Sequence, residues 1–136
     1  MDCIIIDDES TSRTILRNLC SGNKHLNIIQ EFDNVEDTLK YLEEKKVDLI
    51  LLDLHMEGLS GFDLIDRLNS FNLSNFPQII ITTMDEKLAF KGFEYNCTDY
   101  LLKPINRGRF KKAINKARKK YLFNSNFILV KSKKVM

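Results

Sequence analysis

The chain has few cysteines and no long apolar run. Its three cysteines, Cys3, Cys20 and Cys97, are widely separated and form no CxxC pair. This pattern argues against a disulfide framework or a zinc site and is typical of a protein in a reducing cytoplasm. No apolar stretch approaches the roughly 18 residues that a membrane-spanning helix needs. No basic region precedes the first apolar run, so we expect neither a membrane span nor a signal peptide.

Acidic residues are absent from the last part of the chain. All 19 Asp and Glu residues lie within residues 1–99, whereas 12 of the 21 Lys and Arg residues lie within residues 100–136. The net charge of +2 therefore conceals an acidic body and a basic C-terminal arm. The arm is either a solvated helix face followed by a lysine-rich linker, or a surface that faces nucleic acid or an acidic partner.

The 136 residues, 43% hydrophobic and 29% charged, are typical of one globular domain. Five strand-like runs alternate with five helical patterns. The runs are CIIID at 3–7, LNIIQEF at 26–32, VDLILLD at 47–53, FPQIIITT at 76–83 and DYLL at 99–102. The helical patterns cover 11–21, 35–45, 61–71, 87–94 and 106–121. Five βα units with short connections predict a three-layer α/β fold, a doubly wound parallel sheet with helices on both faces.

Strand composition and helix ends refine this prediction. The runs at 4–6, 49–52 and 79–81 are continuously apolar, which indicates central strands, whereas the mixed run at 26–32 suits an edge. In the first helix, Ile15, Leu16, Leu19 and Cys20 are expected on one inward face, with Gly22 ending the helix. Asn34 is the expected N-cap of the second helix. The stretch FNSNFILVKSKKVM after the fifth helix restarts a strand-like pattern.

Polar residues close the predicted strands. Asp7 and Asp8 end the first run, Asp53 the third and Thr82-Thr83 the fourth, and Lys103 follows the fifth. In the strand order 2-1-3-4-5 these ends are contiguous, and the first and third strands flank the point where the strand order reverses. Ligands of such sheets bind at that point, beyond the carboxyl ends of the strands. Asp33 ends the outer second strand and is interpreted as a solvated turn residue.

The residue types in this crevice point to one chemistry. Three neighbouring carboxylates raise one another's pKa, which is costly unless a cation is present. Oxygen ligands of this kind suit Mg²⁺. Carboxylates, Mg²⁺, a lysine and a hydroxyl make a phosphoryl-transfer site in which a carboxylate is the natural nucleophile. An ordinary acidic turn at Asp7-Asp8-Glu9 is the alternative that local sequence alone allows.

Four segments in order carry a family resemblance: IIIDDES, LILLDLHMEGLSGFDL, IIITTMDE and DYLLKPI. With them, residues 2–121 resemble the receiver domain of bacterial two-component response regulators, which has a flavodoxin-like fold. The segment AFKGFEYNCTDYLLKPINRGRFKKAINKA resembles receivers attached to LytTR-type DNA-binding domains. On this resemblance, residues 1–121 form the receiver, and residues 122–136 form a linker and the beginning of a C-terminal effector domain.

The resemblance implies roles for individual residues. Asp53 would be the phosphoacceptor and Lys103 would bind the acyl phosphate, with Pro104 after it in the cis form. The implied ligands of Mg²⁺, or of Mn²⁺ in its place, are Asp7, Asp8, Asp53 and the backbone carbonyl of His55. Thr83, chosen over Thr82 by spacing, would be the switch hydroxyl and Tyr100 the switch aromatic, although an ordinary core aromatic is the other interpretation of Tyr100.

The resemblance also implies partners and a mode of action. A sensor histidine kinase would phosphorylate the receiver in the cytoplasm, and the face of the fourth helix, fifth strand and fifth helix would then mediate homodimerisation. The effector domain would bind DNA. The domain would not be an enzyme beyond its own phosphorylation and dephosphorylation. Two positions depart from the family pattern, with Glu57 in place of a frequent proline and Met84 in place of a small residue.

Other functions remain open from the residues alone. One is a Mg²⁺-dependent phosphohydrolase with an aspartate nucleophile. Such enzymes use a second aspartate two residues after the nucleophile, and this chain has His55 at that position. Another is an interaction module that keeps the fold without phosphorylation, against which the set of acids, Thr83 and Lys103 argues. A flavin-binding protein of this architecture is less consistent with the loops, which lack Ser/Thr/Gly-rich phosphate cradles.

Overall fold

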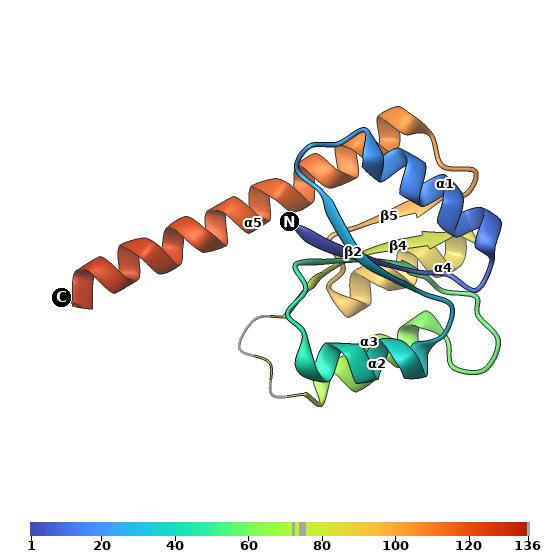
Figure 1. The fold of residues 1–136 in the computed structure, drawn as a ribbon, viewed down its shortest axis with the longest axis horizontal. Coiled ribbons are helices and arrows are strands. Elements are labelled where there is room, and N and C mark those ends of the chain that lie inside the picture. The colour runs from blue at the N-terminus through green and yellow to red at the C-terminus, as the bar shows by residue number, and fades with distance from the viewer. Residues whose placement is uncertain (72, 74–75, 136) are drawn as a thin grey trace.

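The computed structural model describes residues 1–71, 73 and 76–135 (Figure 1). The described part contains one five-stranded sheet in the order β2-β1-β3-β4-β5, and every neighbouring pair is parallel. The strands are β1 (Asp2–Ile6), β2 (Asn27–Phe32), β3 (Leu49–Asp53), β4 (Gln78–Thr83) and β5 (Asp99–Leu102). The predicted strand order is confirmed, with β2 at one edge and β1, β3 and β4 in the interior.

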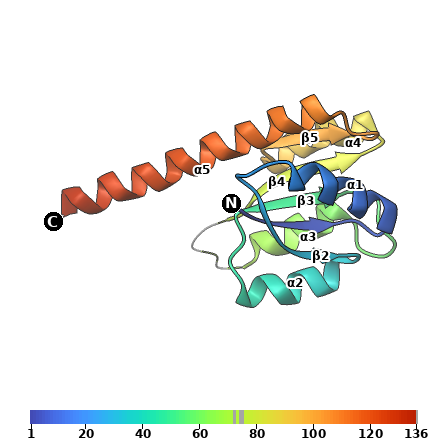
Figure 2. The same ribbon diagram turned by 45° about the horizontal axis from the view of Figure 1, so that its top comes forward.

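Helices cover both faces of the sheet (Figure 2). They are α1 (Ser10–Ser21), α2 (Val35–Glu44), α3 (Gly61–Asn69), α4 (Glu86–Lys91), the 3₁₀ turn η1 (Gly92–Tyr95) and α5 (Arg107–Val135). Helices α2 and α3 lie on one face, and α1 and α5 lie on the other (Figure 2). The three-layer, doubly wound architecture expected from the βα alternation is therefore confirmed.

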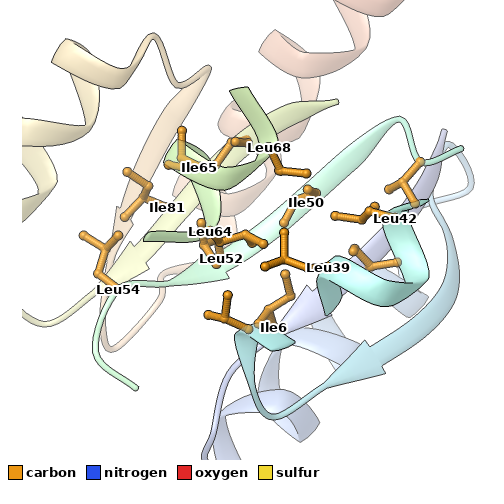
Figure 3. Close-up of a cluster of buried hydrophobic side chains, with 14 residues drawn as sticks. Ile6, Leu39, Leu42, Ile50, Leu52, Leu54, Leu64, Ile65, Leu68 and Ile81 are labelled. Carbon is orange, nitrogen blue, oxygen red and sulfur yellow. The ribbon is translucent and has the colours of Figure 1, made fainter. Parts of the chain in front are cut away.

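Two hydrophobic clusters, one on each face, hold these layers together. The α2/α3 cluster, drawn in Figure 3, takes Ile4, Ile6, Ile50 and Leu52 from the sheet. The α1/α5 cluster takes Cys3, Ile5, Leu49 and Leu51 from the same two strands. Successive residues of β1 and β3 thus face opposite clusters, and all of them are fully buried. This two-sided burial explains the continuously apolar composition of the central strands.

The ends of α1 and α2 follow the expected chemistry. The Asn34 side chain accepts a hydrogen bond from the backbone N–H of Asp37 at 2.8 Å and caps α2. Gly22 is the C-cap of α1. The inward prediction for Ile15 is wrong, because this side chain is 52% exposed while Leu16, Leu19 and Cys20 are buried. Those three share an i, i+3, i+4 stripe, and Ile15 lies about 100° around the helix from its neighbour Leu16.

The fourth helix is shorter than its apolar pattern predicts. The helix α4 ends at Lys91, and the chain then tightens into the 3₁₀ turn η1. Asn96 closes this turn in the left-handed conformation, with φ of 61°. Asparagine tolerates that conformation better than most residues, so it ends the helical segment before β5.

The last helix is longer than expected, and the strand predicted within residues 123–136 is wrong for the described residues. Helix α5 continues without a break to Val135 and projects past the sheet (Figure 1). No glycine or proline follows Gly108, and a lone strand would leave its backbone groups unpaired, whereas a helix pairs them internally. The division into a receiver at 1–121 and a following segment at 122–136 stays a prediction. No helix of the described chain combines the length and the apolarity that crossing a membrane would require.

Candidate functional site

The carboxyl ends of β1, β3 and β5 bring their polar residues together. Asp53 is the last residue of β3, Asp7 and Asp8 follow β1, and Lys103 follows β5. One carboxylate oxygen from each of Asp7, Asp8 and Asp53 lies within 4.8 Å of the other two. The Lys103–Pro104 peptide bond is cis, as expected. Four residues spread over almost a hundred positions thus share one site.

Charge in this cluster is unbalanced. The Nζ atom of Lys103 lies 2.8 Å from Oδ2 of Asp7 and 3.5 Å from Oδ1 of Asp53. Asp7 is fully buried and Asp53 is 4% exposed, whereas Asp8 is exposed. When all four groups are ionised, one ammonium faces three carboxylates, so two negative charges are not neutralised by the protein.

The pKa values of Asp53 and Lys103 are both raised within this cluster. Burial raises the pKa of Asp53 to about 6, and the charge of Asp7 acts in the same direction, while Lys103 and the backbone N–H of His55 oppose the rise. Burial by itself would lower the pKa of Lys103, but its hydrogen bond to Asp7 and the charge of Asp53 outweigh burial and raise it. The lysine is therefore firmly cationic, and the Asp53 carboxylate is held at a cost that a further cation would relieve.

The donor set fits a hard divalent cation. Carboxylate oxygens are the ligands that Mg²⁺ prefers, and the exposure of Asp8 leaves one side open for the waters that Mg²⁺ retains. The excess of two negative charges matches the charge of the ion. The backbone N–H of His55 lies 3.4 Å from Oδ1 of Asp53, so this residue borders the cluster, while its carbonyl as a ligand stays a prediction.

The loop between β3 and α3 adds contacts that sequence reasoning missed. The backbone N–H of Glu57 donates to Oδ2 of Asp8 at 3.3 Å. A Cβ atom at Gly61 would lie 2.6 Å from the backbone oxygen of Asp53, closer than real atoms approach. Gly61 is the first residue of α3, directly after the N-cap Ser60. A glycine at that position is the one sequence signal that could have indicated this close approach to Asp53. The start of α3 therefore packs against the backbone of Asp53, and the loop before it contacts Asp8.

The two threonines at the end of β4 differ in their partners. Both are fully buried. The Thr83 hydroxyl accepts a hydrogen bond from the backbone N–H of Asp85 at 3.1 Å, which fixes the start of the loop into α4. The Thr82 hydroxyl has no hydrogen-bond partner.

Tyr100 stands in an aromatic group on the β5 side of the molecule. Its ring centre lies 6.1 Å from that of Phe90 and 5.5 Å from that of Phe93, which it meets edge to face. The Arg109 guanidinium lies 5.8 Å from the Tyr100 ring centre and forms two hydrogen bonds with Asp99, at 2.7 and 2.9 Å. Tyr100 is half-buried, whereas Phe90 and Phe93 are more than half exposed.

An open hollow of about 750 Å³ lies where the chain leaves β3 and β4. Its lining residues are His55, Met84, Asp85, Glu86 and Lys87. The Met84 side chain, which stands where the family favours a small residue, is 76% exposed. Of the residues around the carboxylate cluster, His55 is the one that lines this hollow.

The family model described as the response regulator receiver domain matches residues 3–115. Among curated proteins, the sensory transduction protein LytR of Staphylococcus epidermidis is 41% identical over 116 residues, covering 85% of this chain and 45% of the relative. The sensory transduction protein LytT of Enterococcus faecalis is 34% identical and covers 88% of this chain and 48% of the relative. The chain thus spans about half the length of these relatives.

Solved structures agree with the sequence matches. The response regulatory domain of protein mrkE from Klebsiella pneumoniae superposes with a TM-score of 0.81 at 30% identity, covering 89% of this chain and 98% of that one. The REC domain of AraT from Geobacillus stearothermophilus superposes with a TM-score of 0.80 at 25% identity, covering 91% and 97%. The names LytR and LytT agree with the resemblance to receivers of LytTR-type regulators.

Proposed function

We propose that this chain, which belongs to the response regulator receiver family and is the receiver domain of a two-component response regulator, accepts a phosphoryl group on Asp53. The donor is the phosphohistidine of a sensor histidine kinase in the cytoplasm. The observation that carries the proposal is the cluster of Asp7, Asp8 and Asp53 beside Lys103. A carboxylate nucleophile, a cation site and a fixed ammonium are the parts that phosphoryl transfer needs.

Asp53 is the nucleophile in the proposed reaction. One of its carboxylate oxygens forms a bond to phosphorus as the bond from phosphorus to the donor nitrogen breaks, and the electron pair leaves with the histidine. Asp7, Asp8, Asp53 and the His55 carbonyl would hold Mg²⁺, or Mn²⁺ in its place, which supplies charge neutralisation and orientation of the phosphoryl oxygens. Asp53 is almost entirely buried, which would limit the access of water to the acyl phosphate.

Lys103 and Thr83 respond to the new charge. Lys103 already contacts Asp53, and a short movement of its ammonium away from Asp7 would bring it to the phosphoryl oxygens. The Thr83 hydroxyl would exchange its present bond with the N–H of Asp85 for a bond to a phosphoryl oxygen. That exchange would release the loop into α4 and couple the phosphoryl group to this helix.

The distant effect would pass through Tyr100. Thr83 and Leu102 are neighbours in the β4–β5 pairing, and Ile81 pairs with Tyr100, so the switch hydroxyl and the aromatic group lie at the same strand pair. Turning of Thr83 would let Tyr100 move inward and repack the exposed aromatic face with Phe90 and Phe93. We propose that this face then forms a homodimer, which brings together two DNA-binding effector domains attached after this chain.

Phosphorylation of the purified chain tests this function. Incubation with acetyl phosphate, or with a phosphorylated histidine kinase, should add one phosphoryl group in Mg²⁺ and none in excess EDTA, as read by intact-protein mass spectrometry. A chain that stays unlabelled with several donors at saturating Mg²⁺ would contradict the proposal. Continuous release of phosphate from small phosphate esters would instead support a phosphohydrolase.

A further inference from the structure

The Thr82 side chain is an exception to the way buried polar groups are satisfied in this protein. The residue is fully buried, and its Oγ1 is the one buried side-chain nitrogen or oxygen without a hydrogen-bond partner among the residues that the structure describes. A buried hydroxyl without a partner costs free energy, since it gives up its bonds to water and receives nothing in return. A valine of the same shape would avoid that cost, so the hydroxyl needs another explanation.

The β3–β4 pairing places Thr82 beside the proposed phosphoacceptor. Thr82 is the direct cross-strand neighbour of Asp53. Two residues earlier in each strand, Ile80 and Leu51 are also neighbours, and both belong to the α1/α5 cluster. Side chains alternate along a strand, so Thr82 and Asp53 lie on that same face of the sheet. Their side chains therefore stand next to each other at the end of the sheet.

The same alternation separates Thr82 from Thr83. Ile81 belongs to the α2/α3 cluster, so Thr83, two residues later, lies on the face opposite Thr82. Only Thr83 has a hydrogen bond to the loop that enters α4. The two adjacent hydroxyls thus face different surroundings.

Lys103 follows β5, the strand on the other side of Thr82 from Asp53. Leu101 is the β5 neighbour of Thr82 and belongs to the α1/α5 cluster, so Lys103, two residues on, leaves β5 on the same face as Thr82. Its Nζ atom reaches Asp53 on β3 and Asp7 beyond it, so the lysine side chain spans the end of β4. Thr82 therefore lies on the strand between the one that Lys103 leaves and the one that ends in Asp53.

We propose that Thr82 is a positioning residue whose hydroxyl donates a hydrogen bond to the Asp53 carboxyl group once that group is phosphorylated. The inference rests on the proposed function. In the structure Oδ1 of Asp53 has Lys103 and the His55 N–H beside it. When Lys103 turns to the phosphoryl oxygens, the carboxyl group loses a donor, and Thr82 is the adjacent side chain with an unused one. Hydrolysis breaks the bond from phosphorus to the Asp53 oxygen and returns negative charge to the carboxyl group. The donated hydrogen bond stabilises this departing carboxylate and so speeds the hydrolysis of the acyl phosphate.

Three variants test the proposal through lifetime and stability together. In Thr82→Val we expect the acyl phosphate to decay about fivefold more slowly, the size of one hydrogen bond. The same variant should have an unchanged or raised thermal unfolding midpoint in EDTA, because it removes an unpaired buried hydroxyl. Thr82→Ser, which keeps the hydroxyl, should restore the wild-type lifetime. The matched control is Thr38→Val, since Thr38 is equally buried but its hydroxyl donates to the Asn34 carbonyl at 2.8 Å. Thr38 belongs to α2, which covers the face of the sheet opposite Thr82 and Asp53.

The control should lower the unfolding midpoint and leave the lifetime unchanged. A wild-type lifetime in Thr82→Val would overturn the inference, as would a lower unfolding midpoint in that variant or a failure of serine to restore the lifetime. If the wild-type chain takes up no phosphoryl group at all, the proposed function fails and the inference fails with it. If the wild type is labelled and only the Thr82→Val lifetime is unaffected, the inference alone fails.

Discussion

Asp53 is a carboxylate that the fold holds in an unfavourable place. It is buried beside Asp7, and its one cationic neighbour, Lys103, lies closer to Asp7 than to Asp53. In the proposed function, the free energy that this arrangement costs would favour binding of a cation and the approach of Lys103 to a phosphoryl group. Such a perturbed, partly satisfied carboxylate is what the proposed role of Asp53 as a nucleophile requires.

The raised pKa of Asp53 predicts a pH dependence of stability. The pKa lies at about 6 in the folded protein, above the ordinary value of 3.8, so the folded state binds the proton more tightly than the unfolded state. The contribution of Asp53 to the free energy of unfolding is therefore fully present below about pH 4 and is lost as the pH rises through about 6. A rise of about two in pKa corresponds to roughly 3 kcal/mol.

Urea unfolding in EDTA, at several pH values across this window, measures that contribution. The difference in unfolding free energy between the wild type and Asp53→Asn should change with pH, because the asparagine cannot titrate. A difference that stays constant from about pH 4 to about pH 7 would contradict the assignment of this pKa to Asp53.

The convergence of Asp7, Asp8, Asp53 and Lys103 could be predicted from sequence because it follows from topology alone. Each residue ends a strand, and parallel strands in the order 2-1-3-4-5 bring their carboxyl ends to one edge. The unpaired hydroxyl of Thr82 could not be predicted, since it depends on which atoms fill the space around one side chain. The exposure of Ile15 has the same origin, because an apolar residue at the border of a helix stripe can face either way.

At the scale of elements, the loop and helix after β3 contact the carboxylate cluster directly. Ser60 and Asp63 form a capping box that fixes the first turn of α3. Gly61, within that turn, meets the backbone oxygen of Asp53, and the N–H of Glu57 meets Asp8. The position of α3 is therefore coupled to the geometry of the carboxylate cluster.

A side chain at Gly61 should disturb the site directly. The added Cβ of Gly61→Ala would press on the backbone of Asp53, which cannot yield as a flexible side chain would. We expect a loss of about 1–3 kcal/mol in stability and slower phosphorylation by acetyl phosphate. The matched control is Gly22→Ala, whose Cβ would have its nearest contact at 3.7 Å, and which should be neutral or slightly stabilising. Equal stability and equal phosphorylation rates in both variants would contradict this coupling.

Element ends show where prediction from local sequence stops. The caps at Gly22 and Asn34 were predictable, since a cap is a contact between near neighbours in the chain. The end of α5 was not, because the residues after Tyr121 suit a strand or a helix about equally, and only the available partners decide. In the described chain no neighbouring strand is present for that segment, and it forms a helix.

At the scale of the whole molecule, the basic helix α5 packs against the acidic body through only part of its length. The buried side chains of α5 are Phe110, Ala113, Ile114 and Ala117. Beyond Ala117 no residue whose side chain the structure describes is buried, and the helix projects from the body (Figure 1). The core that α5 completes is therefore contained in its first part.

A chain shortened to residues 1–121 should fold with nearly the full stability. It keeps every described core residue of α5, and an exposed helix end contributes little, so the free energy of unfolding should change by less than about 1 kcal/mol. A chain that ends at Asn106 loses the whole α5 part of the α1/α5 cluster and should not fold. Unfolding followed by circular dichroism compares the two, and a shortened 1–121 chain that is unfolded would contradict the predicted domain boundary.

The most direct test of phosphorylation at Asp53 compares the wild type with Asp53→Asn and Asp33→Asn. Asp33 is an exposed carboxylate just after β2 and serves as the matched control. With acetyl phosphate and Mg²⁺, the wild type and Asp33→Asn should gain one phosphoryl group by intact mass, and Asp53→Asn should gain none. Undiminished labelling of Asp53→Asn would contradict the assignment of Asp53 as the phosphoacceptor.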